Sequence, residues 1–284
     1  MAKKGLTITM IFEASSANYG EGVGNISQLK KMTRAGGEVY TYISRQALRY
    51  NIVQQMGVDN TPVDNDQKVV QFSPKAKIDE YPEIDLFGYM KTSKGEGQNI
   101  RSAVVRLSNA ISLEPYKSDT DFLNNMGLAQ RAGLENALAQ SEIHKSLYSY
   151  TITIDLDKVG IDNDIDIPAE EKSRRVELLL DTVQFLNRDI RGRRENLNPV
   201  FVVGGVYERK NPYFEDRLRL DKKKLNTGMI EDIINSCDDT KTNTFVGCVN
   251  GFFENDEEIK EVLSSETIST VFSKLKEEVK NFYA

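Results

Sequence analysis

The chain has 284 residues, of which 39% are hydrophobic and 28% are charged, and its formal net charge is −6. This length allows one large domain or two small ones with a real core, and the composition is that of an ordinary soluble globular protein. No stretch reaches the 18 apolar residues of a membrane-spanning helix, and the start, MAKKGLTITMIFEASS, is a poor signal peptide. Cys237 and Cys248 form no CxxC pair, which predicts free thiols in a reducing cytoplasm.

The negative charge is concentrated in one segment. Residues 155–171 contain seven acidic residues and a single lysine. In contrast, residues 26–55 contain five basic residues and one acid, and residues 86–117 contain five basic residues and two acids. Because the distribution of charge governs association more than its sum, the acidic total does not exclude a polyanionic partner for the first half of the chain.

The first predicted element is a strand. In GLTITMIFEA (residues 5–14) apolar and polar side chains alternate, which predicts a strand that is buried on one face. Residues 15–40 follow as a polar, glycine-rich and basic insertion that is too long for a simple connection. A helix is then predicted from about Ser44 to Met56, with Ser44 as the N-cap and Gly57 in the C′ position.

The middle of the chain predicts more strands. Residues 58–82 are polar and lack a pattern, and they form a second insertion. IDLFGYMK (84–91) and IRSAVVRLSNAI (100–111) are interpreted as strands on either side of a hairpin tip, TSKGEGQN. Residues 112–146 lack sustained periodicity and are predicted to leave the core, whereas LYSYTITIDL (147–156) resumes the sheet.

The second half adds a helix over about residues 169–190, which has an apolar stripe at helical spacing, and a strand, NPVFVVGGVYE (198–208). Without the insertions, the order is strand, helix, strand, strand, helix, strand. This order predicts an α+β fold with the βαββαβ arrangement of RRM-like and ferredoxin-like proteins. Residues 210–284 add a strand near TFVGCVNGFF and a closing charged helix over about 256–281, and we expect these additions to pack on the same domain.

Three motifs are weak matches to known sites. GEGVG (20–24) lacks the pattern of a nucleotide-binding loop, and its glutamate would repel phosphate. The acidic segment DLDKVGIDNDID misses the ligand positions of a calcium loop, so a solvated acidic loop is predicted in place of a metal site. His144, the single histidine, has no cysteine cluster with which to bind zinc. We therefore expect no metal and no cofactor.

The start of the helix at Ser44 is more informative. Arg45 and Arg49 lie in its first turns, although this end of a helix is electropositive and two arginines four residues apart repel each other. The free N–H groups behind Ser44 form a potential anion site, to which Gln46 adds neutral donors. This arrangement predicts an external anion, which we interpret as a nucleic-acid backbone. An ordinary capped helix with exposed arginines remains the alternative.

No strand carries the aromatic signature with which RRM domains stack on bases. If RNA binds, helix ends and loops would hold its backbone, which favours binding without sequence preference.

Four blocks resemble a known family: GLTITMIFEASSANYGEGVGNISQLKK, YTYISRQALRY, IDLFGYM and GGVYERKNPYF. Over residues 5 to about 220 the chain resembles the CRISPR-associated backbone subunits of type I Cascade, of the DevR or Cst type, subtype I-B, within the RAMP superfamily. The resemblance implies a hand-shaped protein with an RRM-like palm (a single domain over 1–284), finger-like insertions at 15–40 and 58–82, and a thumb at 112–146.

The resemblance also implies the partners: CRISPR RNA, target DNA paired to that guide, further copies of the chain in a helical filament and other Cascade subunits, in the cytoplasm and away from membranes. The family's Ser-x-Gln-x-x-basic pattern corresponds to Ser44, Gln46 and Arg49. A hydrophobic thumb tip would wedge into the RNA–DNA duplex, with Leu123, Met126 and Leu128 as candidates. The remaining candidates for backbone contact are basic: Lys30, Lys31, Arg34, Arg45, Arg101, Arg106, Arg209 and Lys210.

The chain is not expected to be an enzyme, because no nucleophile, base and stabiliser occur together in its sequence. One alternative is an RNA-cleaving backbone of the type III kind, for which Asp119, Asp121 and His144 would be the suspects. The other is a regulator that binds its own transcript, as the DevR name suggests.

Overall fold

The computed structural model describes residues 4–284 except 16, 35, 67–68, 94–96 and 137. It is a mixed α+β structure around an eight-stranded sheet. Strand β1 (Gly5–Ala14) lies at the centre and runs antiparallel to β14 (Ser146–Asp155) and β19 (Phe201–Tyr207). Beyond β19 lies β22 (Thr244–Cys248). Beyond β14 lie β10 (Val105–Leu107), β11 (Ala110–Ser112), β5 (Val39–Ile43) and β4 (Lys31–Thr33).

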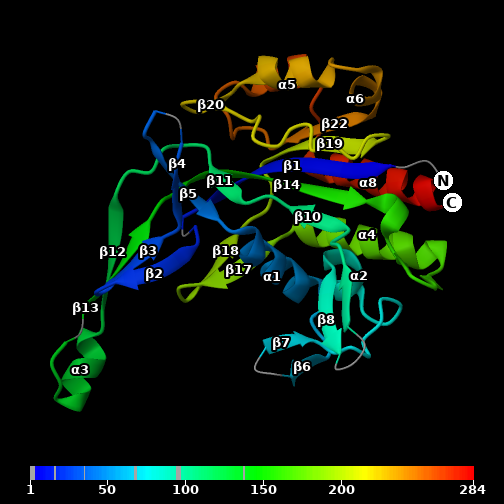
Figure 1. Ribbon diagram of the computed structural model, residues 1–284. Coiled ribbons are helices and arrows are strands. Elements are labelled where there is room, and N and C mark those ends of the chain that lie inside the picture. Colours follow the sequence, from blue (N-terminus) through cyan, green and yellow to red (C-terminus); the bar gives the residue numbers. More distant parts are fainter. Residues whose placement is uncertain (1–3, 16, 35, 67–68, 94–96, 137) are drawn as a thin grey trace.

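Both faces of this sheet are covered, so β1 is buried on both sides. Leu6 and Met10 pack in one core with residues of α1 (Arg45–Met56), α4 (Ala169–Gln184) and α8 (Ile268–Tyr283). Ile11 packs in a second core with α5 (Thr227–Ile234) and α7 (Asp256–Leu263). The prediction of a half-buried strand was wrong, because residues from the C-terminal third cover the threonine face (Figure 1).

Two predicted helices have different ends in the structure. Helix α4 stops at Gln184, and the chain then forms a hairpin of β17 (Asn187–Ile190) and β18 (Arg193–Asn196). The two turn residues of this hairpin, Arg191 and Gly192, have φ values of 51° and 75°. An α-helix has negative φ values, so it cannot continue through these residues. The closing helix is divided into α7 and α8 by Ser264, which has a φ of 50°.

A lower lobe is built from residues 63–101. It contains two hairpins, β6 (Val63–Asp66) with β7 (Val69–Phe72) and β8 (Tyr89–Ser93) with β9 (Gly97–Arg101), and the helix α2 (Pro82–Phe87). The predicted strand over 84–91 was therefore wrong for residues 84–87. Pro82 stands at the first turn of α2, where its fixed φ favours a helix, and two acids follow it.

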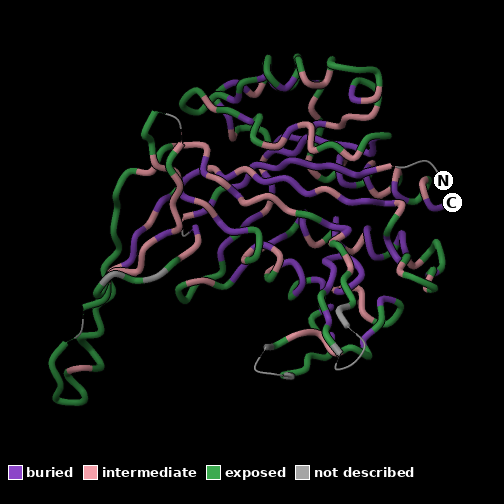
Figure 2. Tube along the Cα trace, viewed as in Figure 1, coloured by how far each residue is buried: buried purple, intermediate pink, exposed green. Residues whose placement is uncertain are grey.

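A long arm leaves the sheet on the opposite side from the chain ends (Figure 1). It consists of β12 (Asp119–Asn124), α3 (Met126–Ala132) and β13 (Leu138–Ile143). Its base is joined by β2 (Tyr19–Val23) and β3 (Ile26–Leu29), and the strand order is β12-β13-β3-β2. Segments from residues 19–29 and 119–143 thus form one sheet. Figure 2 shows that the outer part of the arm is exposed, and α3 buries no residue.

The remaining elements are short and lie near the ends of the larger ones. Their bounds are η1 (Leu156–Lys158), β15 (Ile161–Asp162), β16 (Ile165–Asp166), β20 (Leu220–Asp221), β21 (Lys224–Leu225) and α6 (Asp238–Asn243).

Candidate nucleic-acid interface

The start of α1 has the predicted cap but few free N–H groups. Ser44 is the N-cap, and its hydroxyl accepts a hydrogen bond from the amide of Ala47 (3.3 Å). The same hydroxyl donates to Oδ1 of Asn18 (2.7 Å), and the amide of Arg45 donates to Oδ1 of Asn109 (2.9 Å). Most of the backbone N–H donors at this helix end therefore already bond neutral oxygens of the protein. The prediction that Ser44 and free N–H groups hold a phosphate needs correction, because the Ser44 hydroxyl is buried and bonded within the protein.

The arginines and the glutamine of this helix remain accessible, and they share a groove. Arg45, Gln46 and Arg49 line a groove of about 390 Å³ with Arg106 and the apolar Phe87. Arg45 and Gln46 are exposed, and Arg49 is half-buried. The wall opposite the helix is formed by residues 103 and 105–107. We call this cavity the α1 groove. It brings together three guanidinium groups from two segments that are far apart in the sequence.

Arg49 is held in place by an aromatic ring. Its guanidinium lies 5.1 Å from the centre of the Phe87 ring, within the range of a cation–π contact. Burial lowers the pKa of Arg49, and the charge of Glu83 raises it in part. Because an arginine remains charged throughout the physiological range, the α1 groove contains a partly desolvated positive charge, which attracts an anion more strongly than an exposed one does.

Two other basic candidates are bonded to the protein's own acids. Asp85 Oδ1 accepts a hydrogen bond from Arg101 (2.6 Å), whose side chain is only 7% exposed. Lys210 pairs with Asp157. The structure thus gives Arg101 a structural role in place of the predicted backbone contact, and it leaves Lys210 largely neutralised.

Arg106 and Arg209 differ from these two. Arg106 donates to Asp155 Oδ2 (3.1 Å), yet its side chain is still about half exposed and lines the α1 groove. Arg209 is exposed.

The acidic segment accounts for these pairings. Asp155 and Asp157 bind basic side chains, Asp162 accepts a hydrogen bond from the Tyr89 hydroxyl (2.7 Å), and Asp166 pairs with Lys172. The prediction of a solvated acidic loop was wrong in part: the fold brings counter-charges to most of its carboxylates, whereas Asp164 and Asp166 stay exposed. Within the part of the chain that the structure describes, no cluster of three or more histidine, cysteine or acidic residues could hold a metal ion.

The basic residues of the first insertion lie near the base of the arm. Lys31 donates to Glu142 Oε1 (2.6 Å) and lies 4.7 Å from the centre of the Tyr116 ring, so it joins the arm to the sheet. Arg34 lies 3.5 Å from Asp216 and 5.0 Å from the centre of the Tyr40 ring. Lys30 is half-buried. Lys31 therefore has a structural partner, and none of the three lines the α1 groove.

The arm tip exposes the three predicted apolar residues. Leu123, Met126 and Leu128 are 48%, 52% and 58% exposed. The sequence analysis missed three further exposed apolar side chains of the arm, Phe122, Leu134 and Leu138. Their position in a polar segment without periodicity was the available signal. A set of exposed apolar side chains of this kind is typical of a contact surface.

A basic hairpin, formed by β17 and β18, was not predicted from the sequence. In β17–β18, the guanidinium of Arg191 lies 4.2 Å from the centre of the Tyr19 ring at the base of the arm. The run DIRGRRE was the signal in the sequence, but it was assigned to the end of a helix and the loop that follows.

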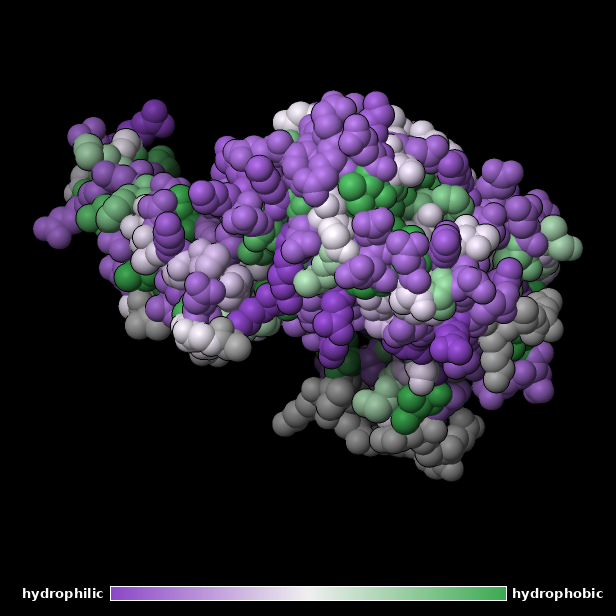
Figure 3. All heavy atoms as spheres, turned by 90° about the horizontal axis from the view of Figure 1, so that it is seen from above, coloured by the Kyte–Doolittle hydropathy of each residue, from purple (hydrophilic) through white to green (hydrophobic). Residues whose placement is uncertain are grey.

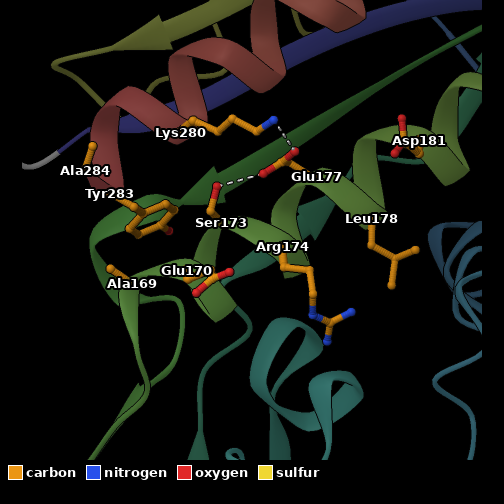
Figure 4. A pocket seen from close by; sticks show the side chains of 10 residues that line it. All are labelled: Ala169, Glu170, Ser173, Arg174, Glu177, Leu178, Asp181, Lys280, Tyr283 and Ala284. Atoms are coloured by element: carbon orange, nitrogen blue, oxygen red, sulfur yellow. Dashed lines mark hydrogen bonds and ion pairs between the residues drawn. The ribbon is translucent and has the colours of Figure 1, made fainter.

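A wider groove of about 710 Å³ lies between α4 and α8 (Figure 4). Several of its charges are paired: Glu177 accepts a hydrogen bond from the Ser173 hydroxyl (2.8 Å) and lies 3.2 Å from Lys280 Nζ. Asp181, which also lines this groove, pairs with Lys276 (2.6 Å).

Two of the suspects for RNA cleavage, Asp119 and His144, line one groove of about 580 Å³ at the base of the arm, whereas Asp121 does not line it. His144 is buried, its Nδ1 lies 2.7 Å from the Thr41 hydroxyl, and burial lowers its pKa. Asp119 and Asp121 stand on β12, where both are exposed.

In the described part of the chain, no helix has the length and apolarity needed to cross a membrane.

The fold is that of chains from CRISPR RNA-guided surveillance complexes. One such chain, from a structure titled "CRISPR RNA-guided surveillance complex, pre-nicking", superimposes with a TM-score of 0.66 at 11% identity, covering 97% of this chain and 100% of that one. Another, from a "CRISPR RNA-guided surveillance complex", gives a TM-score of 0.61 at 13% identity, covering 96% and 99%.

The family follows from the sequence match. The model of the family described as "CRISPR-associated negative auto-regulator DevR/Csa2" matches residues 6–227, and the chain belongs to this family. A curated relative from Myxococcus xanthus (strain DK1622), "CRISPR-associated protein Cas7/Cst2/DevR", is 28% identical over 158 residues, which are 48% of this chain and 52% of the relative. The match thus spans about half the length of that relative.

Proposed function

We propose that this protein is a CRISPR RNA-binding backbone subunit of a type I-B Cascade complex, and that it is not an enzyme. In this proposal, copies of the chain assemble along one guide RNA and hold its backbone while its bases pair with target DNA. Family membership and the fold of surveillance-complex chains support this role. The sheet order β19-β1-β14, with β10 and β11 beyond β14, is consistent with an RRM-like palm of βαββαβ type.

The observation that carries the proposal is the α1 groove. Arg45, Arg49 and Arg106 converge on one cavity, and the groove's lining residues include no acid. Charged guanidinium groups recognise phosphate oxygens through two parallel N–H donors, and contacts of this kind fix a strand without reading its bases. The groove therefore suits a nucleic-acid backbone of any sequence.

The test is a double substitution, Arg45→Ala with Arg49→Ala, in the full chain. Binding of a labelled 30-nucleotide RNA would be measured by fluorescence anisotropy between 50 and 300 mM salt. Each lost phosphate contact reduces the salt slope of a single strand by about 0.7, so the expected reduction is about 1.4, with a similar loss of affinity for unrelated sequences.

A matched control removes the same charge elsewhere. Lys75 and Lys77 are exposed in the lower lobe and are not part of the α1 groove. The Lys75→Ala, Lys77→Ala variant is expected to keep the slope of the original protein. Equal slopes for the two double variants would overturn the proposed role of the α1 groove.

The family description favours one second candidate, a regulator that binds its own transcript. A gel shift with the free protein would separate the two roles. The regulator requires tight binding to its own leader RNA over unrelated RNA of equal length, whereas a backbone subunit requires equal binding. The type III alternative predicts regularly spaced cuts when an assembled complex meets complementary RNA and magnesium.

A further inference from the structure

A strongly basic hairpin lies above the base of the arm, away from the α1 groove. Five cations lie between residues 217 and 224, with Asp221 as the single acid: Arg217, Arg219, Lys222, Lys223 and Lys224. All five are exposed. Among the described residues, none of them lies within ion-pair distance of a carboxylate. The five cations of the hairpin thus form no ion pair with any described residue, whereas Arg101 and Lys210 are paired with the protein's own acids.

The tip of the hairpin carries lysine where the backbone favours other residues. Strands β20 and β21 pair Leu220 with Leu225 and Asp221 with Lys224, so Lys222 and Lys223 form the turn. Lys222 has a φ of 56°, a conformation for which glycine and asparagine are preferred. Because residues held in such strained conformations cluster at functional sites, the charge of Lys222 is a candidate for binding a ligand.

A groove of about 580 Å³ joins the hairpin to the base of the arm. Lys117, Lys145 and Lys222 line it, each from a different segment of the chain. Two acids also line it. Glu114 turns inward and accepts a hydrogen bond from the Ser146 hydroxyl (2.8 Å), and Asp119 is exposed. Lys145 lies 3.3 Å from Glu13, whereas Lys117 and Lys222 form no ion pair within 4.0 Å among the described residues. We call this cavity the lysine groove.

The composition of the lysine groove favours nucleic acid over protein. Protein interfaces are depleted of lysine and have an apolar centre, whereas nucleic-acid interfaces are polar and basic. The apolar lining residues Leu113, Ile143 and Leu220 are all half-buried. Figure 3, which views the molecule from the side of β20 and α5, shows mainly hydrophilic side chains on this face.

We propose that the lysine groove and the hairpin of residues 217–224 form a second site for a nucleic-acid phosphate backbone, separate from the α1 groove. Its lysines act as point charges without bidentate geometry, so the site binds a backbone without fixing its register. The ligand is either a single strand or a duplex, which share this phosphate chemistry.

The test uses a triple variant of the full chain, Lys117→Gln, Lys222→Gln and Lys223→Gln. Glutamine removes the charge and is as strained as lysine at position 222, so the fold is preserved. Two probes are titrated from 50 to 300 mM salt: a labelled 30-nucleotide single-stranded RNA and a labelled 30-base-pair DNA duplex. The control, Lys75→Gln, Lys77→Gln and Lys260→Gln, removes three exposed charges elsewhere.

The expected result is at least a tenfold loss of affinity for one probe at low salt, with a salt slope smaller by about 2 for the single strand or about 2.7 for the duplex. The responding probe identifies the ligand. Two results would overturn the proposal: values equal to those of the control variant, or a changed oligomeric state in sedimentation with unchanged nucleic-acid affinity, which would indicate a protein partner. If Arg45→Ala with Arg49→Ala has no effect while the triple variant does, the proposed role of the α1 groove fails and this second site stands.

Discussion

At the scale of single residues, Asp85 joins segments that are far apart in the chain. Its carboxylate is fully buried and accepts hydrogen bonds from Arg101 (2.6 Å), Arg175 (2.8 Å) and the amide of Gly160 (2.9 Å). Arg175 is also almost fully buried. One carboxylate of α2 thus fixes the lower lobe against α4 and against the loop that precedes it.

Asp85→Asn is expected to destabilise the protein strongly. The substitution leaves two nearly buried guanidinium groups without their shared counter-ion, and breaking a buried pair in this way costs about 3–5 kcal/mol. Urea unfolding followed by circular dichroism would measure the loss. Asp64→Asn, at an exposed position of β6, is the control and should stay within about 0.5 kcal/mol of the original protein. A small loss for Asp85→Asn would show that the lower lobe does not depend on this carboxylate.

Glu171 makes the stability of α4 depend on pH. Hydrogen bonds from Arg174 (2.6 Å) and Arg175 (2.8 Å) lower the pKa of its carboxyl to about 2, from an ordinary value of 4.5. Because the pKa is lower in the folded state, the stabilisation is present above pH 4.5 and is lost as the pH falls towards 2.

The difference in unfolding free energy between the original protein and Glu171→Gln should therefore be constant above about pH 5 and shrink as the pH falls below the unfolded pKa. Glu170→Gln, at the neighbouring exposed position, is the control for the loss of one carboxylate from the first turn of α4. A difference that grows on acidification would contradict the assignment.

Among the helices and strands, α1 is an element whose two ends are determined by neighbouring residues in the sequence. Its N-cap Ser44 and its C′ residue Gly57 were predicted from the sequence, and the structure confirms both ends. Gly57 has a φ of 66°, and its amide bonds the carbonyl oxygens of the last turn. A helix end of this kind needs only the residues next to it, so the sequence is sufficient to predict it.

Gly57→Ala should destabilise the protein by about 1 kcal/mol, since alanine is strained at positive φ. No atom lies within 4 Å of the position of the new Cβ, so the loss is purely conformational. Gly127→Ala is the matched control. Gly127 lies inside α3, also has open space around it and has no positive φ, so alanine there should be neutral or slightly stabilising. Thermal unfolding would compare the two, and equal effects would refute the conformational cause.

The predicted burial of β1 and the predicted end of α4 were wrong, because contacts with distant segments determine both. The alternation in GLTITMIFEA predicts an exposed face, but Thr7 and Thr9 are fully buried because the C-terminal third covers them. The apolar stripe of α4 was extended to Ile190, although the turn at Arg191 and Gly192 makes the last residues a hairpin. A local pattern contains no information about which distant segment packs on it.

At the scale of the whole molecule, charges far apart in the sequence meet in the fold. The sequence predicted an anion site from Arg45, Gln46 and Arg49, which share one helix and line the α1 groove. It could not predict that Arg101 would bind Asp85 or that Lys210 would bind Asp157, since these pairs are set by tertiary contacts. Two basic hairpins, at 187–196 and 217–224, were missed because their positions depend on the same contacts.

The outer part of the arm packs little against the core. Its tip exposes Leu123, Met126 and Leu128 and its helix buries nothing, so their replacement by serine should change the unfolding free energy by less than about 0.5 kcal/mol. If the arm tip contributes to assembly of copies along an RNA, the same triple variant should bind fewer copies per RNA. Mass photometry of complexes on a 60-nucleotide RNA would count them. Val63→Ser with Val70→Ser, which are also exposed, should leave the count unchanged. A normal count for the arm variant would show that these side chains serve neither folding nor assembly.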